Sequence, residues 1–233
     1  MDGPDRPDRG DPALRHFEAK IRLLERSGGH WIDHGTVLPD EPQPYEREWA
    51  GSALLDGTDV YLFFTAAGVA DRPGGYQQRL YEAKATLGAD GFPADWSQPR
   101  PCLASDHPAY QLANAHEGRA GEIKAFRDPA FFRDPADGSD YLIFTASLAD
   151  AKPQFNGAVG IAKRHAGGWD LLPPLLQADG VNNELERAHA VSVTEAITCS
   201  APHSAPPSHR ACGMPRTACT GWSRTACSGN IGP

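Results

Sequence analysis

The sequence predicts an all-β fold made of repeated four-stranded units, a partial β-propeller with about three blades. Three tryptophans, Trp31, Trp96 and Trp169, are each followed seven residues later by a leucine. The first and third copies align without a gap at an offset of 138 residues, and this alignment places Glu48 on Glu186. Equivalent positions of a propeller converge on its axis, so a charged residue at such a position is a candidate for a functional site.

The composition agrees with this fold class and argues against two kinds of partner. The 233 residues include 24 Gly and 21 Pro and are 40% hydrophobic, which is typical of many short strands joined by turns. A formal net charge of -8 argues against a nucleic-acid partner, because phosphate binding needs clustered Lys and Arg. No apolar run approaches the length of a membrane span, so we expect no membrane partner. Residues 1–8 lack the stretches of a secretory signal, so we expect either a cytoplasmic protein or a missing start.

The first predicted strand begins after residue 18. Ala19, Ile21 and Leu23 alternate with charged residues, which is the pattern of a half-buried strand, and a Gly-Gly turn follows. A helix over residues 13–25 is the alternative, because several apolar side chains also share a helical face there. The aligned copy later in the chain is too rich in glycine for a helix, and this favours the strand.

A second unit recurs in the chain and completes each blade. An Asp-Gly pair at residues 56–57 leads into the run Tyr-Leu-Phe-Phe-Thr-Ala at 61–66. Another pair at 137–138 leads into Tyr-Leu-Ile-Phe-Thr-Ala at 141–146. Asp-Gly is a strong signal for a tight hairpin, and each run favours a strand buried on both faces. Each repeat is therefore predicted to be a meander of about four strands.

The repeat pattern stops near the C-terminal end of the chain. Residues 192–233 contain no Leu, Phe or Tyr, and they repeat the tetrapeptide Arg-Thr-Ala-Cys. Such a segment buries too little apolar area to offset the entropy lost on ordering, so we expect a disordered tail or one translated from the wrong reading frame. Residues 1–17 are expected to be disordered or the remnant of a lost blade. The predicted propeller domain is therefore 18–191.

Three segments occupy the predicted innermost-strand position, at residues 48–53, 126–129 and 183–189. Together they resemble glycoside hydrolase family 68, the levansucrase family of five-bladed propeller fructosyltransferases. The resemblance covers residues 18–191. It implies a partial five-bladed β-propeller and an enzyme that transfers fructosyl units from sucrose to levan or to water by a retaining mechanism with two carboxylates.

The resemblance also implies the roles of individual residues. Glu186 is the expected acid/base and Asp128 the expected transition-state stabiliser, because the departing oxygen needs a proton and the fructosyl cation needs negative charge nearby. The expected substrate-binding residues are Trp49, which resembles a wall of the sucrose pocket, and Arg127, Glu184 and Arg187. No metal and no cofactor is implied. The expected partners are sucrose and fructan acceptors.

Each candidate also has a structural alternative. Glu186 and Arg187 fit a surface ion pair, and Trp49 fits an ordinary core position. Asp128 precedes a proline and fits a turn residue. A second Arg-Asp-Pro copy at 133–135 fits a turn better, because it runs straight into an Asp-Gly pair. This comparison favours Asp128 as the site residue.

The sequence departs from the family pattern at two places. Ala50 stands where the family usually has a serine, whose hydroxyl would help to orient the nucleophile. The nucleophilic aspartate of the family lies in a Trp-Asp segment on the first blade, and we expect this chain to begin after that blade. Asp33, in the only Trp-X-Asp of the sequence, is expected in the outer loop after Trp31 and not on an inner strand. The chain is therefore expected to be an inactive fragment.

Two other functions stay open at the level of the sequence. One is a propeller β-fructosidase that uses water as its only acceptor, and the other is a non-catalytic propeller fragment that binds a sugar or a protein. The family resemblance suggests an extracellular protein, although this chain shows no signal peptide. The linkage formed, the length of the product and the oligomeric state stay open.

Overall fold

The computed structural model describes residues 16–103, 107–117, 123–151, 155–193 and 196–200, with the backbone alone at 193 and 196–200. Apart from a 3₁₀ turn at 16–18, the regular structure in these ranges consists of strands, and no α-helix occurs there. The prediction of an all-β fold is confirmed. No helix in the described part is long and apolar enough to cross a membrane.

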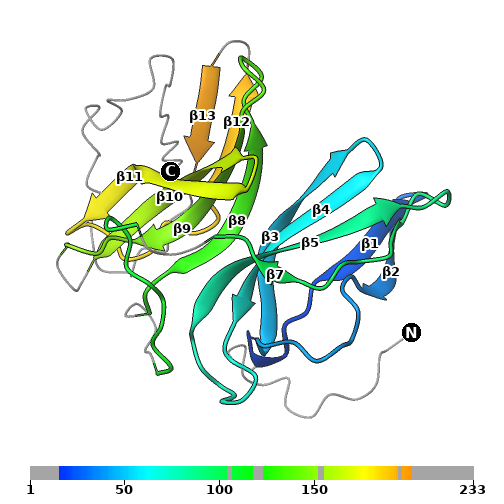
Figure 1. Cartoon of the computed structure of the whole chain (residues 1–233), viewed down its shortest axis with the longest axis horizontal. Coiled ribbons are helices and arrows are strands. Elements are labelled where there is room, and N and C mark those ends of the chain that lie inside the picture. The colour runs from blue at the N-terminus through cyan, green and yellow to red at the C-terminus, as the bar shows by residue number, and fades with distance from the viewer. Residues whose placement is uncertain (1–15, 104–106, 118–122, 152–154, 194–195, 201–233) are drawn as a thin grey trace.

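Two complete blades form the centre of the molecule (Figure 1). The first blade has the strand order β3-β4-β5-β6, with β7 also paired to β5. Its strands are β3 (Arg47–Asp56), β4 (Asp59–Ala67), β5 (Gln78–Leu87), β6 (Pro93–Ala94) and β7 (Arg100–Pro101). The second blade is an antiparallel meander in the order β8-β9-β10-β11. Its strands are β8 (Phe126–Arg133), β9 (Asp140–Ser147), β10 (Asn156–His165) and β11 (Gly168–Asp179).

A two-stranded hairpin precedes the first blade and another follows the second. The first hairpin is β1 (Arg22–Ser27) with β2 (His30–Thr36), so residues 22–27 form a strand and not a helix. The last hairpin is β12 (His189–Val193) with β13 (Ala196–Ser200). Two blades and two half-blades amount to about three blades, as the repeat predicts. Strand β13 lies beyond the boundary expected at 191, and residues 201–233 lie outside the described residues.

The predicted hairpins are formed by the Asp-Gly pairs. Gly57 and Gly138 have φ of 63° and 73°, a left-handed conformation that glycine adopts without steric cost. The strands that follow them, β4 and β9, are buried along most of their length. Both runs therefore lie in the middle of their blades, covered on both faces, which explains their lack of alternating polarity.

The tryptophan repeat marks the outer hairpin of a blade. Arg26 pairs with Trp31 between β1 and β2, and Arg164 pairs with Trp169 between β10 and β11, so the two hairpins have the same register. The prediction of an outer loop after Trp31 is wrong, because the residues after this tryptophan continue as strand β2, as those after Trp169 continue as β11. Trp96 differs, since it follows β6 outside any strand and packs against the core of the first blade.

Aromatic side chains join the two blades. The Phe63 ring stacks on Phe131 with centroids 5.8 Å apart and meets the Trp169 ring edge-on at 5.6 Å. The guanidinium of Arg164 lies 5.0 Å from the centre of the Tyr61 ring. Trp31, the counterpart of Trp169, is 68% exposed. The same repeat position is therefore part of a blade interface in one copy and faces solvent in the other.

This difference predicts unequal costs for the same substitution at the two tryptophans. Trp169→Ala is expected to lower the free energy of unfolding by about 2 kcal/mol, because it removes a partly buried ring from the blade interface. Trp31→Ala is expected to cost less than about 0.5 kcal/mol, because the Trp31 ring is largely exposed and its removal takes away little buried surface. Urea denaturation followed by circular dichroism measures both values. Equal losses would contradict the assignment of these positions.

Candidate active site

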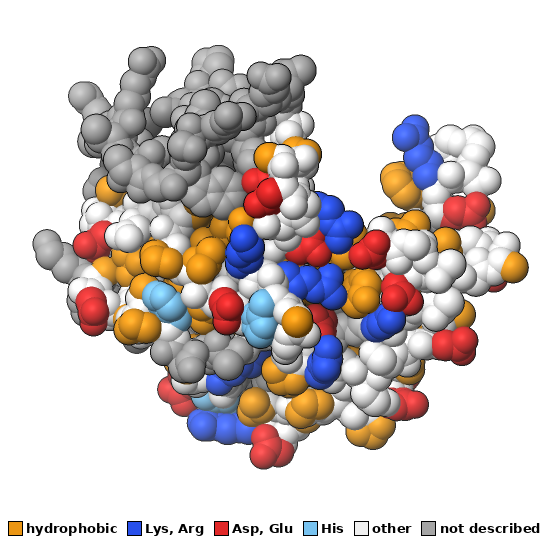
Figure 2. All heavy atoms as spheres, turned by 45° about the horizontal axis from the view of Figure 1, so that its top comes forward, with side chains coloured by type: hydrophobic (Ala, Val, Ile, Leu, Met, Phe, Trp, Pro, Cys, Tyr) orange, Lys and Arg blue, Asp and Glu red, His pale blue; other side chains and the backbone are white. Residues whose placement is uncertain are grey.

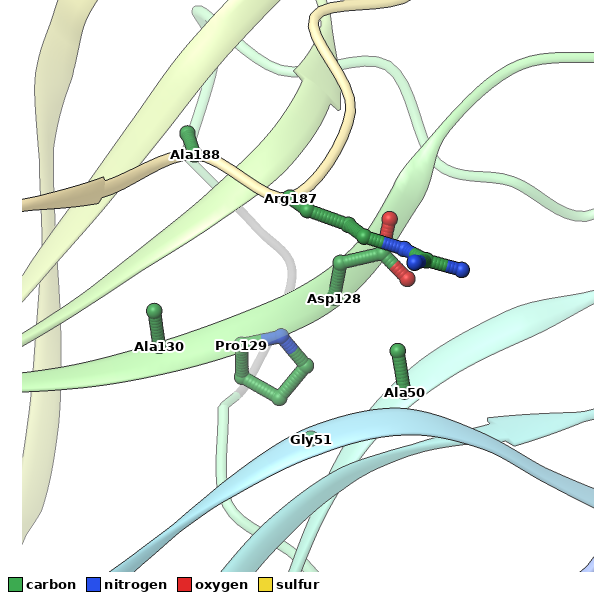
Figure 3. Close-up of a pocket in the computed structure, with 7 residues that line it drawn as sticks. All are labelled: Ala50, Gly51, Asp128, Pro129, Ala130, Arg187 and Ala188. Atoms are coloured by element: carbon green, nitrogen blue, oxygen red, sulfur yellow. The ribbon is translucent and has the colours of Figure 1, made fainter. Parts of the chain in front are cut away.

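A pocket opens where the inner strands β3 and β8 approach the segment before β12 (Figure 3). Its volume is about 180 Å³, and it is lined by Ala50, Gly51, Asp128, Pro129, Ala130, Arg187 and Ala188. The two blades are joined beside it by a hydrogen bond from the Phe131 N–H to Ser52 Oγ at 2.8 Å. In Figure 2 acidic and basic side chains lie next to one another in the middle of the molecule, beside apolar surface. The pocket is thus built from residues of three successive blade units.

Both inner strands are irregular at the pocket. The register of β3 shifts between Trp49 and Gly51, and that of β8 shifts between Arg127 and Ala130. Such bulges bend a strand and change the direction of its side chains, and they occur often next to active sites. Asp128 lies in the second bulge with φ of 58°, a conformation that costs a non-glycine residue on the order of 1–3 kcal/mol. The surrounding structure has to hold this residue in place.

Arg127 gathers the carboxylates of the site. Its Nη2 lies 2.9 Å from Glu186 Oε1 and 3.0 Å from Glu184 Oε1, and its Nε lies 3.6 Å from Asp128 Oδ2. The Arg127 side chain is 8% exposed, whereas that of Glu186 is 41% exposed. Figure 3 shows the Arg187 side chain lying beside the Asp128 carboxylate. One buried guanidinium therefore holds three carboxylates from β8 and the turn before β12.

Burial and neighbouring charges set the ionisation of this cluster. Burial raises the pKa of Asp128, Glu186 raises it further, and Arg127 and Arg187 oppose the shift without reversing it. Burial lowers the pKa of Arg127, but the charges of Glu184 and Asp128 outweigh burial and the pKa is raised overall. Arg127 therefore stays cationic throughout the physiological range. A group of acids around one fixed cation is suited to proton transfer and to stabilising positive charge.

The raised pKa of Asp128 predicts a dependence of stability on pH. The folded state holds the Asp128 proton to a higher pH than the unfolded state, so stability is lost as pH rises through the folded pKa. Asp128→Asn is therefore expected to be more stable than the wild type at pH 7, by about 1 kcal/mol. The difference is expected to vanish below about pH 4, the usual range of an aspartate. Urea denaturation across this pH range measures it.

Asp140→Asn is the matched control for this prediction. A hydrogen bond from Arg133 lowers the pKa of Asp140, so its ionised form favours the folded state. Its replacement is expected to reduce stability at neutral pH, the opposite sign to Asp128→Asn. A destabilised Asp128→Asn protein at pH 7 would contradict the burial effect.

The structure brings together five of the six residues proposed from the sequence: Arg127, Asp128, Glu184, Glu186 and Arg187. Trp49 lies on β3 next to the pocket residue Ala50, but its own side chain is not part of the pocket lining. The Trp49 Nε1–H donates to the His16 carbonyl at 3.2 Å, and the Arg47 guanidinium lies 5.3 Å from its ring centre. In this structure Trp49 packs beside the site.

Two other acidic residues considered from the sequence, Glu48 and Asp33, lie outside this cluster. Glu48 is buried and accepts hydrogen bonds from Lys20 Nζ and the Ile21 N–H, each at 3.0 Å, so it lies outside the cluster that contains Glu186. It lies within β3 beside the chain that enters β1, and there it satisfies a backbone donor. Asp33 lies on β2 and pairs with Arg22 at 2.8 Å on the surface, away from the inner strands.

Asp134 is a turn residue, as the sequence predicts. Its Oδ1 accepts from the Ala136 N–H at 2.8 Å, the hydrogen bond of an Asx-turn. Two buried threonines, Thr65 and Thr145, contact the site although sequence reasoning assigned them no role. Their signal is visible in the sequence, because each is the one polar residue within an otherwise apolar β-strand run.

Similarity to known proteins shows the family of the chain. A family model described as levansucrase/invertase, for glycoside hydrolase family 68, matches residues 6–160. The chain belongs to glycoside hydrolase family 68. The match includes the Arg-Asp-Pro segment of β8 and both Asp-Gly hairpins, so it covers the first two of the three segments that carry the resemblance.

Relatives in family 68 are longer than this chain. Levansucrase from Rahnella aquatilis is 29% identical over 208 residues, covering 76% of this chain and 48% of the relative. Levansucrase from Erwinia amylovora is 28% identical over 206 residues, with coverage of 76% and 48%. Inulosucrase from Halalkalicoccus jeotgali bound to kestose has a TM-score of 0.66 and 37% identity, covering 78% of this chain and 49% of that one. The chain spans about half the length of these relatives, and its fold is that of a partial five-bladed propeller.

Proposed function

We propose that the site performs the chemistry of a levansucrase-type fructosyltransferase that acts on sucrose and passes fructosyl units to fructan acceptors or to water. The observation that carries this proposal is the cluster around Arg127, where one guanidinium lies within 3.6 Å of three carboxylates, of which Asp128 lines the pocket. The names of the relatives, levansucrase and inulosucrase, agree with such a substrate. The family relationship also favours an extracellular protein, and one relative is named extracellular sucrase.

Glu186 is the proposed acid/base. Its side chain is accessible to solvent, while the ion pair with Arg127 holds the carboxylate in the site. In the first step the proton of Glu186 passes to the departing oxygen of glucose as the glycosidic C–O bond breaks and a nucleophilic carboxylate bonds to the fructosyl carbon. In the second step an acceptor hydroxyl gives its proton to Glu186 and displaces that carboxylate.

Asp128 is the proposed transition-state stabiliser. Its buried carboxylate lines the pocket, and its negative charge at this position favours the positive charge that develops on the fructosyl ring. Arg127 and Glu184 would orient sugar hydroxyls, with Arg187 beside Asp128 as a further donor. Trp49 would contribute a wall to the substrate site only if its ring turned from His16 toward the pocket.

In the described part of the chain, Arg127 pairs with no further carboxylate that could serve as the nucleophile. Within the described residues, the carboxylates bonded to Arg127 are those of Asp128, Glu184 and Glu186, to which the proposal gives other roles. Asp33 lies on the outer strand β2. Because the retaining route needs a covalent nucleophile, we propose that this chain by itself binds sugar without turnover.

The proposal is tested with the purified chain and sucrose. Binding is followed by NMR titration, and turnover by an enzymatic assay for released glucose. Asp128→Asn and Glu186→Gln are expected to weaken sucrose binding, whereas the control Glu82→Gln, at a residue that pairs with Arg100 and does not line the pocket, is expected to leave it unchanged. No sucrose binding by the wild type would overturn the proposal, and glucose release above background would overturn the expected lack of turnover. Affinity that survives in both site variants would favour a non-catalytic binding protein.

A further inference from the structure

Two threonines occupy the same position in the two complete blades. Thr65 on β4 and Thr145 on β9 each end an apolar run of the same pattern, and both side chains are fully buried. Each lies opposite the irregular part of its inner strand, because Trp49 pairs with Thr65 and Arg127 pairs with Thr145. At each bulge the threonine hydroxyl faces the inner segment of the next blade.

The two hydroxyls make the same contact across the blade boundary. Thr65 Oγ1 accepts a hydrogen bond from the Asp128 N–H at 2.8 Å and donates to the Ala50 carbonyl at 3.4 Å. Thr145 Oγ1 accepts from the Arg187 N–H at 3.1 Å and donates to the Leu185 carbonyl at 3.0 Å. A longer contact of 3.5 Å joins Thr145 Oγ1 to Asp128 Oδ2.

The residues held in this way have an unusual backbone conformation. Asp128 and Arg187 have φ of 58° and 51°, and they are two of the four non-glycine residues with positive φ in the described part of the chain. An L-residue leaves this region unless its surroundings hold it there. Both side chains line the pocket, so the strained backbone is what directs them toward it.

We propose that Thr65 and Thr145 are positioning residues, each of which holds one pocket residue of the following blade in the left-handed conformation that directs its side chain into the site. This inference rests on the proposed function of the site for its biological meaning, but its geometry stands by itself. Valine has the shape of threonine without the hydroxyl, so Thr65→Val leaves the buried Asp128 N–H without an acceptor. Asp128 is then expected to relax outward, where water reaches its carboxylate.

Two readouts on the full chain separate positioning from a general effect on stability. The pKa of Asp128, followed by carboxyl ¹³C NMR, is expected to fall toward the usual aspartate value in Thr65→Val. The affinity for sucrose is expected to fall by about tenfold, the usual effect of one unpaired buried donor. Thr145→Val is expected to lower the affinity similarly, through Arg187 and through the lost contact with Asp128 Oδ2. Thr65→Ser and Thr145→Ser keep the hydroxyl and are expected to restore wild-type behaviour.

Ile143→Val is the matched control, because Ile143 is a buried residue of β9 that does not itself line the pocket and bonds neither Asp128 nor Arg187 through its side chain. It is expected to lower the melting temperature while leaving the pKa of Asp128 and the sucrose affinity unchanged. An unchanged pKa in Thr65→Val, or an equal change in Ile143→Val, would overturn the positioning role. If the wild type binds no sucrose, the proposed function fails, and the pKa measurement still decides whether Thr65 positions Asp128.

Discussion

Arg127→Met is expected to abolish sucrose binding and to lower the free energy of unfolding by about 3 kcal/mol at pH 7, a loss typical of removing one partner of a buried ion pair. Methionine fills a similar space, but it leaves the carboxylates of Asp128, Glu184 and Glu186 facing one another without a cation. The pKa of Asp128 is expected to rise further, because the nearest opposing charge is gone. The stability loss should therefore shrink as pH falls and Asp128 takes up its proton.

Arg100→Met is the control for this prediction. Arg100 also bonds a carboxylate, with Nη2 2.6 Å from Glu82 Oε1, but its side chain is 76% exposed. Its replacement is expected to cost less than about 1 kcal/mol, as for other surface ion pairs. Urea denaturation at several pH values compares the two variants. A loss in Arg127→Met that equals that of Arg100→Met and does not depend on pH would contradict the electrostatic role of Arg127.

Gly51→Ala is expected to lower the free energy of unfolding by about 3 kcal/mol, the upper range for overpacking a tight site. A Cβ at Gly51 would lie 2.0 Å from the carbonyl oxygen of Phe63 and 2.9 Å from the Cα of Phe64. Both atoms belong to the backbone of β4, so no side-chain rotation relieves the clash. Strands β3 and β4 would have to separate beside the pocket, and sucrose binding is expected to be lost with the stability.

Gly167→Ala tests whether the effect at Gly51 is specific to its surroundings. A Cβ at Gly167 would meet only the ring of His165, at 3.2 Å, and this side chain is able to move. The cost is expected to stay below about 0.5 kcal/mol, which is typical of surface substitutions. Thermal denaturation of the two variants provides the comparison. A loss of stability in Gly51→Ala as small as that in Gly167→Ala would contradict the prediction, because it would show that the backbone of β4 moves to accommodate the Cβ.

Sequence reasoning was most successful where the signal is local. The Asp-Gly pairs and the apolar runs after them determine two hairpins, because turn conformation and burial depend on a few adjacent residues. The family resemblance located Arg127, Asp128, Glu184, Glu186 and Arg187, which the structure places in one cluster. It is the fold that brings these segments together, and a single motif read alone gives no reason for them to meet.

Predictions from the sequence fail at repeat positions whose side chains contact different neighbours in each copy. The alignment equates Glu48 with Glu186, yet Lys20 lies beside the first and Arg127 beside the second. Thr65 was overlooked because its partner, the Asp128 N–H, belongs to another blade 63 residues away in sequence. Periodicity identifies equivalent positions, but the contacts of each copy depend on the packing of successive blades, which a single sequence does not contain.

The size of the Phe63 ring is expected to affect the width of the pocket. It packs against Phe131 and Trp169 of the second blade, so a change in its size is expected to change how the two blades meet. Ala50 and Asp128 both line the pocket and belong to different blades. A smaller or larger side chain at position 63 would therefore narrow or widen the opening for the sugar without altering any group that touches it. Substrate preference in such a molecule can therefore change through residues that pack between the blades, such as Phe63, as well as through residues that contact the sugar.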